Sequence, residues 1–427
     1  MRSPNVNIIV ADENYAIPPG FITSFSLSAS ISEAYPVGQF EIDDPEGLFL
    51  EKMIIKPGNR LIVNMEEKQT ERSSSLKEKN FGLYVVTGVS GDPADSLSPD
   101  NIVPNITSSL GGKVVVQFAH PWSIFSDYDS HAYKDQIGKI VSQIVRSTKR
   151  GFSFAGTYIA SETDDKGIIT RFKTNESEAS FIVNKLLPYV TIDRQPVYSF
   201  VNEIGEFYLT NFQRLYALDP LAILLPEAAD ITPNIYDIVQ DKQKVALNYL
   251  SGSWVLGKDF ADHFAYFKRW AVIHSAKDAT TFRALMPYKP SIQNGNMLIK
   301  ADVIRNTEAT SAEVVTHRDF LDGTNSLVNA SKKLDKFFTA TVITPFSADV
   351  ASVGYTVDWR LPSPSDPLKR HWLSGKWLVI ESETIMRDKD QFFSRLTLAR
   401  PAVRVTSSET TPDTINLQSL YNPDRDL

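Results

Sequence analysis

Three acidic residues near the amino terminus have the types and spacing of metal ligands or of a catalytic carboxylate pair. Asp43, Asp44 and Glu46 fall close together in the segment FEIDDPEG. Carboxylate oxygens bind hard cations and act as general acids and bases. However, Asp44 precedes Pro45 and Glu46 precedes Gly47, a composition that favours a turn. We expect these residues to form a turn and not a site.

A second acidic group occurs in the segment DDKG, made of Asp164, Asp165, Lys166 and Gly167. The same two interpretations apply to it, cation binding or a turn. The segment lacks the ligand at the twelfth position that an EF-hand calcium loop requires. We therefore expect a hairpin turn.

Ser123, Asp127 and His131 supply the residue types of a hydrolase triad, and His120 lies near them in the sequence. In such a triad a histidine removes the proton of a serine nucleophile, and an acidic residue orients the histidine. Spacing along the chain is no evidence for a triad, and no Gly-x-Ser-x-Gly elbow accompanies these residues. We expect them to lie at the surface and at the edge of the core.

Glu381 and Glu383 alternate along one candidate strand and would share a face of it. Two carboxylates on one face resemble the catalytic pair of a glycosidase. The flanking Trp377 and Ile380 fit an ordinary strand with one buried and one solvated face. We expect the two glutamates to be surface residues of this strand.

The segment SLGGK, which ends at Lys113, resembles part of a phosphate-binding loop. Thr107 stands where the first glycine of that loop is required, and Val114 replaces the Ser or Thr that should follow the lysine. The segment is therefore not expected to bind a nucleotide.

The other residue types that bind metals or act as nucleophiles provide no site. The chain has no cysteine, which excludes disulfides, thiolate metal ligands and cysteine catalysis. No close pair of histidines has metal-ligand spacing. A cluster of aromatic residues could bind a sugar or a partner, although alternating aromatic residues usually pack a core. We predict no catalytic, cofactor-binding or metal site. The histidines are His120, His131, His263, His274, His317 and His371, and the aromatic cluster is Phe260, Phe264, Tyr266, Phe267 and Trp270.

The composition is that of a globular protein. The chain has 427 residues, of which 42% are hydrophobic and 22% charged, and this length suggests about three domains. A net charge of -7 and a pI near 5.5 provide no basic stripe for a phosphate backbone, so no direct nucleic-acid specificity is expected. No signal peptide and no run of about eighteen apolar residues occurs. We expect a protein made outside the secretory pathway, without membrane insertion.

Period-two alternation of apolar and polar residues extends from residue 22 to about residue 125. This pattern indicates antiparallel strands. Two polar segments, 66–80 and 91–110, are expected to be solvated loops. The candidate strands are 23–27, 39–42, 60–65, 81–89 and 113–118.

Helical periodicity replaces this alternation in the middle of the chain. In 135–149 the apolar residues recur on one helical face, which predicts an amphipathic helix. A second helix is expected from Asn175, which can cap it while Glu178 reaches back, to Pro188, which ends it. A hairpin follows, with VYSFV and EFYLTNF joined by the turn residues 202–205. The apolar face of the first helix is Ile137, Ile140, Val141, Ile144 and Val145.

These patterns predict an α+β, mainly β fold in which two similar antiparallel β-barrel domains flank α+β insert domains. In the mixed middle part we expect strands at 253–256 and 262–270 and a helix at 326–337. The expected domains are 1–125 (first β-barrel hub domain), 126–215 (α+β insert), 216–336 (mixed α+β/β domain), 337–401 (second β-barrel hub domain) and 402–427 (extended C-terminal tail).

Three sequence segments of the first barrel have counterparts in the second, in the same order. This order favours an internal duplication, and the alternative is two unrelated domains with ordinary strand chemistry. Three copies of a duplicated chain in a ring would present six similar surfaces around one axis. The matches are PGNRLIV at 57–63 with VGYTVDW at 353–359, FGLYVVTGV at 81–89 with SGKWLVIES at 374–382, and KVVVQFAHP at 113–121 with SRLTLARP at 394–401.

The sequence resembles the baseplate central hub proteins of contractile-tailed bacteriophages, whose fold is shared with the hub part of type VI secretion spike proteins. The resemblance extends over most of 20–401. It lies in FEIDDPEG, in the strands PGNRLIV and LYVVTGV, in the helix entry TNESEASFI, and in the terminal LSGKWLVIESETIMRDKDQFFSRLTLAR.

This resemblance implies a homotrimer in the particle, with a central channel and two barrels per subunit in a pseudo-sixfold ring. One face would meet the hexameric tail tube or its initiator proteins, and the other would grip the central spike protein. The tape measure and baseplate wedge proteins are further candidate partners. The implied location is the virion, in the phage tail baseplate, after assembly in the host cytoplasm. Such a hub is not an enzyme, and no cofactor is implied.

Two other functions remain open at this point. One is a phage particle-associated cell-wall hydrolase or glycan-binding module that uses Glu381, Asp358 or Asp44. The other is the hub of a type VI or similar injection device. Because no fused spike follows residue 427, we expect a phage with a separate spike protein.

Overall fold

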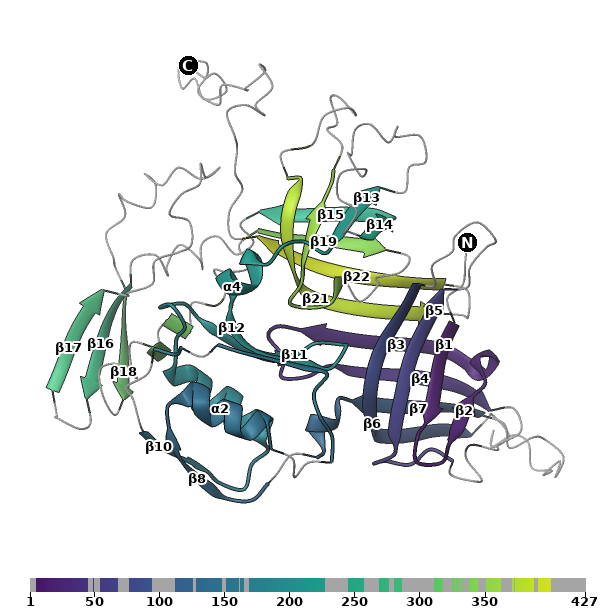
Figure 1. Cartoon of the computed structure of the whole chain (residues 1–427), viewed down its shortest axis with the longest axis horizontal. Coiled ribbons are helices and arrows are strands. Elements are labelled where there is room, and N and C mark those ends of the chain that lie inside the picture. Colours follow the sequence, from purple (N-terminus) through teal and green to yellow (C-terminus); the bar gives the residue numbers. More distant parts are fainter. Residues whose placement is uncertain are drawn as a thin grey trace, which may run out of the picture.

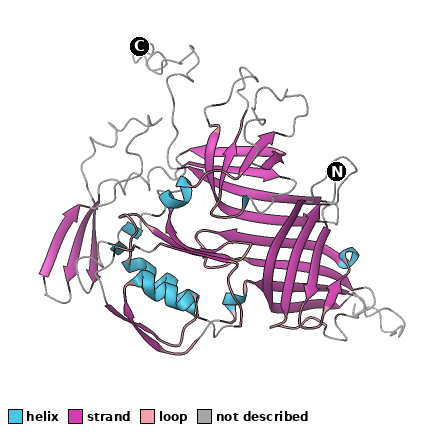
Figure 2. Cartoon of the chain, viewed as in Figure 1, coloured by secondary structure: helices cyan, strands magenta, loops and turns pink. Residues whose placement is uncertain are grey.

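The structure is a computed structural model of the chain. It describes residues 5–44, 49, 54–67, 77–93, 112–125, 128–147, 151–160, 162–164, 169–226, 245–256, 269–275, 280–285, 311–317, 325–326, 328–329, 332, 338–344, 351–361, 371, 373–387 and 391–400. Most of these residues are in strands, as Figure 2 shows, so the α+β, mainly β class is confirmed.

The N-terminal β module is an antiparallel sheet with the strand order β3-β4-β7-β6-β5-β1-β2 (Figure 1). Its residues alternate between a buried and a solvated face. In β3, for example, Phe25, Leu27 and Ala29 are buried and the serines between them are not. All five strands predicted from the sequence are confirmed. The strands are β1 (Asn5–Val10), β2 (Tyr15–Ile17), β3 (Ile22–Ser30), β4 (Val37–Asp44), β5 (Arg60–Glu67), β6 (Lys77–Pro93) and β7 (Gly112–Ala119).

The two polar segments expected to be loops are in part strand. Strand β5 continues through Glu67 and β6 begins at Lys77, with Glu66 opposite Glu78 in the ladder. Strand β6 also continues through Pro93. Main-chain hydrogen bonds hold a hairpin together whatever its side chains, so a polar composition does not by itself end a strand. The rest of both segments, 68–76 and 94–111, lies outside the described residues.

The insert that follows packs one long helix, α2 (Ile137–Val145), over a small three-stranded sheet with the order β11-β12-β9. The five apolar residues predicted to share one face of this helix are all buried. The predicted hairpin is confirmed as β11 and β12. The other elements are β8 (His131–Asp135), β9 (Gly156–Ile159), β10 (Ile169–Lys173), β11 (Val197–Val201), β12 (Glu206–Asn211) and α4 (Phe212–Ala217).

The second predicted helix exists but begins differently. Asn175 lies before the helix with a φ of 45, and Ser177 is the cap, because its Oγ accepts a hydrogen bond from the Ser180 N–H at 3.1 Å. Glu178 does not reach back, since its carboxylate accepts a hydrogen bond from Trp122 at 3.2 Å. Sequence alone does not distinguish these caps, because Asn and Ser are about equally favoured at this position. The helix consists of α3 (Glu178–Ser180), the π-helical η4 (Phe181–Leu186) and the 3-10 turn η5 (Leu187–Tyr189).

The C-terminal β module contains strands from two distant parts of the chain. Strand β13 pairs in parallel with β20 and β14, and β15 pairs with β19. The strands of 222–256 therefore join a sheet that was expected to begin at 337. Local patterns could not show this, because the pairings of β13 with β20 and of β15 with β19 link residues that are far apart in the chain, such as Ala222 with Val357 and Ser251 with Ile343. The strands are β13 (Ala222–Pro226), β14 (Val245–Tyr249), β15 (Ser251–Leu256), β19 (Phe338–Thr344), β20 (Thr356–Trp359), β21 (Gly375–Arg387) and β22 (Gln391–Arg400).

A separate sheet of three strands lies at the opposite end of the molecule from the N-terminal module (Figure 1). It consists of β16 (Arg269–Ser275), β17 (Thr280–Leu285) and β18 (Ser311–His317). Of the strand expected at 262–270 only Arg269 and Trp270 are described, and most of the helix expected at 326–337 and all of 402–427 lie outside the described residues.

The two β modules share five strands in the same order. In the N-terminal module the order is β3-β4-β7-β6-β5, and in the C-terminal module it is β15-β19-β22-β21-β20. All these neighbours are antiparallel in both modules. The closure of each module into a barrel stays a prediction.

The residue register is also the same in both modules. Tyr84 lies opposite Leu61, and its counterpart Trp377 lies opposite Val357. A β-bulge occurs at the same place in the pairing of β6 with β7 and in the pairing of β21 with β22. It lies between Val86 and Gly88 in β6 and between Val379 and Glu381 in β21. A shared bulge is a specific feature, because bulges are conserved within families and not scattered at random. Internal duplication therefore explains the three sequence matches better than chance does.

Candidate functional site

Of the three acidic residues near the amino terminus, Asp44 makes a structural hydrogen bond. Asp44 is buried, and its Oδ2 accepts a hydrogen bond from the Phe49 N–H at 2.9 Å. Asp43 is an exposed residue of β4, and Glu46 lies outside the described residues. Asp44 therefore links the end of β4 to Phe49, while the residues of the expected turn, 45–48, lie outside the described residues.

Asp164 also has a structural role. Its Oδ2 accepts hydrogen bonds from the Arg194 N–H at 2.7 Å and from Thr191 Oγ1 at 3.3 Å. Asp165, Lys166 and Gly167 lie outside the described residues. Asn325 donates to the Asp164 carbonyl at 2.7 Å, so this corner ties the insert to a distant part of the chain.

The residues of the candidate triad do not form one. Ser123 Oγ is buried with no hydrogen-bond partner among the described residues, and Asp127 lies outside them. His131 lies at the start of β8, opposite Lys173. His120 is buried against Phe154, and its Nδ1 accepts a hydrogen bond from the Trp122 N–H at 3.2 Å. Burial lowers the pKa of His120 to about 3. Within the described residues, the structure thus brings no base to Ser123.

Glu381 and Glu383 do share one face of β21, as predicted. Both line an open hollow of about 680 Å³, together with Arg395 and small hydroxyl residues. Glu383 forms an ion pair with Arg395 at 3.2 Å. Asp358, the third acidic residue considered for a hydrolase, is not among the residues that line this hollow. Its carboxylate forms an ion pair with the buried Arg360 at 2.9 Å.

The sequence predicted no metal site and no membrane insertion, and the structure bears on these predictions only in the residues that it describes. Within the described ranges, no three histidine or acidic side chains come together as metal ligands. His274 and His317 lie on β16 and β18, while His263 and most of the aromatic cluster lie outside the described residues. Each helix that the structure describes is too short or too polar to span a bilayer.

A polar face continues across both modules. Strand β3 of the N-terminal module pairs with β21 of the C-terminal module, from Ser24 opposite Arg387 to Ser30 opposite Glu381. The two sheets therefore form one surface. A second hollow of about 440 Å³ lies on the N-terminal part of it, lined by Ser26, Gln39 and Gln117 among others.

Small hydroxyl and amide groups dominate this face. Its serines and threonines alternate with buried apolar residues along β3, β19 and β22. Two of its carboxylates are paired, Glu383 with Arg395 and Glu41 with Lys113 at 2.8 Å. The hydrogen bond from Lys113, followed by that from Thr23, lowers the pKa of Glu41. Glu33 and Glu381 add further carboxylates, so the described part of this surface presents hydrogen-bonding groups and no excess of basic charge.

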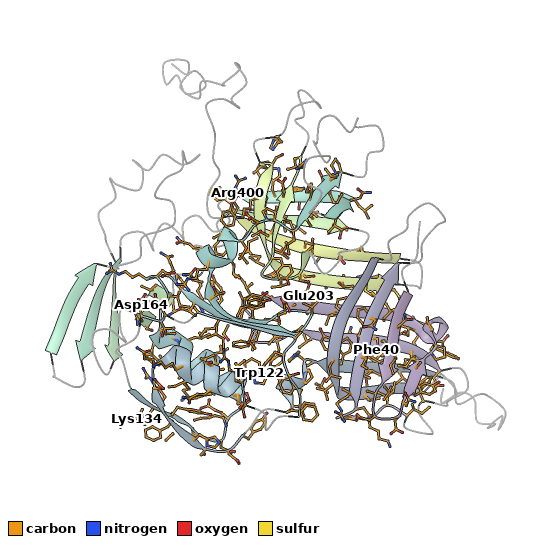
Figure 3. All side chains as sticks on the ribbon, viewed as in Figure 1. Phe40, Trp122, Lys134, Asp164, Glu203 and Arg400 are labelled. Carbon is orange, nitrogen blue, oxygen red and sulfur yellow. The ribbon has the colours of Figure 1, made fainter. Side chains whose placement is uncertain are left out.

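A hairpin of the insert fixes the two modules relative to each other. The turn between β11 and β12 contacts both of them, and Figure 3 places Glu203 between the two modules. The Glu203 carbonyl accepts a hydrogen bond from the Tyr84 hydroxyl at 2.8 Å, and its carboxylate accepts one from the Val353 N–H at 3.1 Å. Burial and then the charge of Glu203 raise the pKa of Tyr84.

Glu206 of the same hairpin makes a further contact to the C-terminal module, through Tyr355, and also binds residues of the hairpin itself. The carboxylate of Glu206 accepts hydrogen bonds from Tyr208 at 2.7 Å, Tyr355 at 3.0 Å and Asn202 at 2.9 Å. Burial is the main cause that raises the pKa of both tyrosines. Sequence reasoning found this hairpin but missed its acidic residues. The only available signal was two glutamates beside a glycine turn in an otherwise apolar hairpin.

Comparison with known proteins gives a match in structure and none in sequence. No protein-family model matches the chain. A search of curated proteins also finds no match. A tail protein from Neisseria meningitidis MC58 is similar with a TM-score of 0.53 and 9% identity, over 93% of this chain and 97% of that one. The 43 kDa tail protein of prophage MuSo2 from Shewanella oneidensis is similar with a TM-score of 0.50 and 8% identity, over 93% of this chain and 98% of that one.

A third similar structure is the c3393 protein of E. coli, described as a component of the type VI secretion system. It gives a TM-score of 0.44 at 9% identity, over 92% of this chain and 77% of that chain. The fold assignment rests on the first two structures. The chain has the fold of phage tail proteins, and this agrees with its resemblance to baseplate hub proteins.

Proposed function

We propose that this chain is the structural baseplate hub of a contractile phage tail. Three copies form a ring of six β modules, which joins the hexameric tail tube to the central spike in the virion. The observation that carries the proposal is the duplication, with its shared strand order, register and bulge. Three duplicated chains combine threefold with approximate sixfold symmetry, so one ring can meet partners of both kinds.

The polar face supports this role. In a ring, a continuous sheet across the module junction would line the central channel with serine, threonine and glutamine side chains. Small hydroxyl groups, carboxylates and paired basic side chains give a passing polymer little to bind, because unpaired basic charge is what attracts a phosphate backbone. The function of the chain then lies in its shape and symmetry, without enzymatic activity.

The proposal is tested by producing the phage without this chain. Tails should then lack the junction between tube and spike, and electron micrographs should show no complete baseplates. Supplying the wild-type chain should restore them. Normal tails in its absence would contradict the proposal.

One observation favours a second candidate, a cell-wall hydrolase or glycan-binding module. Glu381 and Glu383 face the same hollow, which has room for a sugar. Zymography on cell-wall substrate decides between the two functions, with the double variant Glu381→Gln and Glu383→Gln as the control. The hub proposal predicts no cleared band for either protein. A band that is lost in the double variant would support the hydrolase.

A further inference from the structure

The junction within the chain joins one strand of each β module. In that junction, β3 pairs along its outer edge with the C-terminal half of β21. The counterpart of β3 in the C-terminal module is β15, and the counterpart of β21 in the N-terminal module is β6. Among the described strands, β15 pairs only with β19, and the C-terminal half of β6 pairs only with β7. Within the described part of the chain, no strand pairs with either of them along the edge where its counterpart has a partner strand.

Residues on the edges of β15 and β6 are more exposed to solvent than their counterparts in the inner junction. By register, Trp254 of β15 corresponds to Leu27 of β3. Leu27 is 2% exposed, whereas Trp254 is 46% exposed. On the other strand, Gly91 is exposed, while its counterpart Thr384 is 1% exposed. A half-exposed tryptophan on a sheet edge is a common mark of an interaction surface.

We propose that β15 of one chain pairs antiparallel with the C-terminal half of β6 of a second copy of this chain. The inference rests on the proposed hub function and names the contact that would close its ring. The register copied from the inner junction sets Val255 opposite Ser90 and Trp254 opposite Gly91. Because Gly91 has no side chain, the indole of Trp254 has room to cover it.

The two edges suit a head-to-tail ring. Each chain offers one edge of each kind, so the contact is heterologous and repeats around an axis until the ring closes. Pro93 lies at the far end of the β6 edge and has no N–H to donate. The ladder between chains therefore ends at this residue, and the pairing is limited to the few residues before it.

Cysteine cross-linking tests this register directly, because the chain has no cysteine of its own. The test variant carries Val255→Cys and Ser90→Cys. Residues directly opposite in an antiparallel pair have Cα atoms about 4.5 to 5.5 Å apart, within the range of a disulfide. The positive control, Ser28→Cys with Glu383→Cys, places cysteines at the matching positions of the inner junction. The mismatched control, Ser251→Cys with Ser90→Cys, is displaced by about 13 Å along the strand.

The full-length variants are oxidised at high protein concentration and separated on non-reducing gels. The test variant should give a covalent species of three chains that reverts to single chains on reduction. Separate single variants, when mixed, should give only covalent dimers. The positive control should close within one chain. Single chains only from the test variant, or an equal yield from the mismatched control, would overturn the inference.

A charge on the β15 edge supplies a second measurement. In the test variant, Trp254→Lys should lower the yield of cross-linked chains about tenfold, because a lysine on a strand edge opposes pairing with another strand. Phe172→Lys is the matched control, since Phe172 is 66% exposed on the insert, away from both edges. Its yield should equal that of the test variant. An equal effect of both lysines would contradict the inference.

The failure of this inference is distinguishable from the failure of the hub proposal. If tails contain a threefold ring of this chain and the cysteine pair does not cross-link, the pairing of β15 with β6 is wrong and the hub stands. If tails contain no such ring, the proposed function is wrong, whatever the cross-linking yields.

Discussion

At the scale of single residues, His120 lies in an aromatic cage where the N-terminal module meets the insert. Its ring stacks on Phe154 at 5.5 Å and contacts the edge of Phe152 at 5.5 Å. Its Nδ1 accepts the Trp122 N–H, a role that requires the neutral ring. Burial lowers its pKa from 6.5 to about 3, so the folded protein keeps the ring neutral in mild acid.

The protein should therefore lose stability as the pH falls below about 6.5. Between this pH and about 3, the unfolded chain binds a proton at His120 that the folded chain does not, so the free energy of unfolding falls with pH. From pH 7.5 to pH 5.0, this histidine should account for a loss of about 2 kcal/mol. Urea unfolding of the wild type and of His120→Asn at both pH values measures it. Equal losses in the two proteins would contradict this assignment.

The hydroxyl of Tyr84 joins the N-terminal module to the hairpin of the insert. Tyr84→Phe should lower the free energy of unfolding by about 1 to 2 kcal/mol, because it leaves the buried Glu203 carbonyl without this donor. Tyr158→Phe is the matched control, since its hydroxyl is 3.3 Å from Glu206 and Tyr158 is 51% exposed. The control should change stability by less than about 0.5 kcal/mol. A loss as large in the control would argue against a special role of the Tyr84 contact.

At the scale of elements, the turns before β5 and β20 are built alike. Gly58 has a φ of 93 and Gly354 a φ of 91. The Gly58 N–H donates to Val86 O at 2.8 Å, and the Gly354 N–H donates to Val379 O at 2.9 Å. The turns differ in their surroundings, because a Cβ on Gly354 would lie 3.1 Å from the Phe200 ring and one on Gly58 would meet nothing within 4 Å.

This difference predicts unequal effects of one substitution. Gly58→Ala should cost about 1 to 2 kcal/mol, the strain of an alanine at positive φ. Gly354→Ala should cost more, because Phe200 of the hairpin must also move. Denaturant unfolding of both variants gives the comparison. If Gly58→Ala were the more damaging variant, the two turns would not be equivalent.

Elements with local signals were predictable from the sequence, and elements held by distant pairings were not. The apolar face of α2 repeats within the helix itself, and the strands of the N-terminal module alternate within their own length. Strands β13 and β14 are short and apolar, and β13 pairs in parallel with β20, which lies far away in the chain. Parallel strands need a long connection, so the residues near either strand carry no sequence pattern that predicts the pairing.

At the scale of the whole molecule, sequence matches revealed part of the duplication. They covered β5, β6 and β7 and their counterparts, where Tyr84 and Trp377 are both large and buried. They missed β3 and β15, because Leu27 corresponds to Trp254 and Phe25 to Gly252. The polar face was not predictable from the sequence, since a surface formed across two modules has no motif of its own.

Cryo-electron microscopy of intact tails tests the central claim most directly. The account predicts a ring of three copies of this chain on the tail axis, between tube and spike, with six similar β modules around the channel. In that ring, the contact between chains should repeat the contact of β3 with β21 within the chain. A chain that is absent from the tail axis, or a ring with other than three copies, would contradict the account.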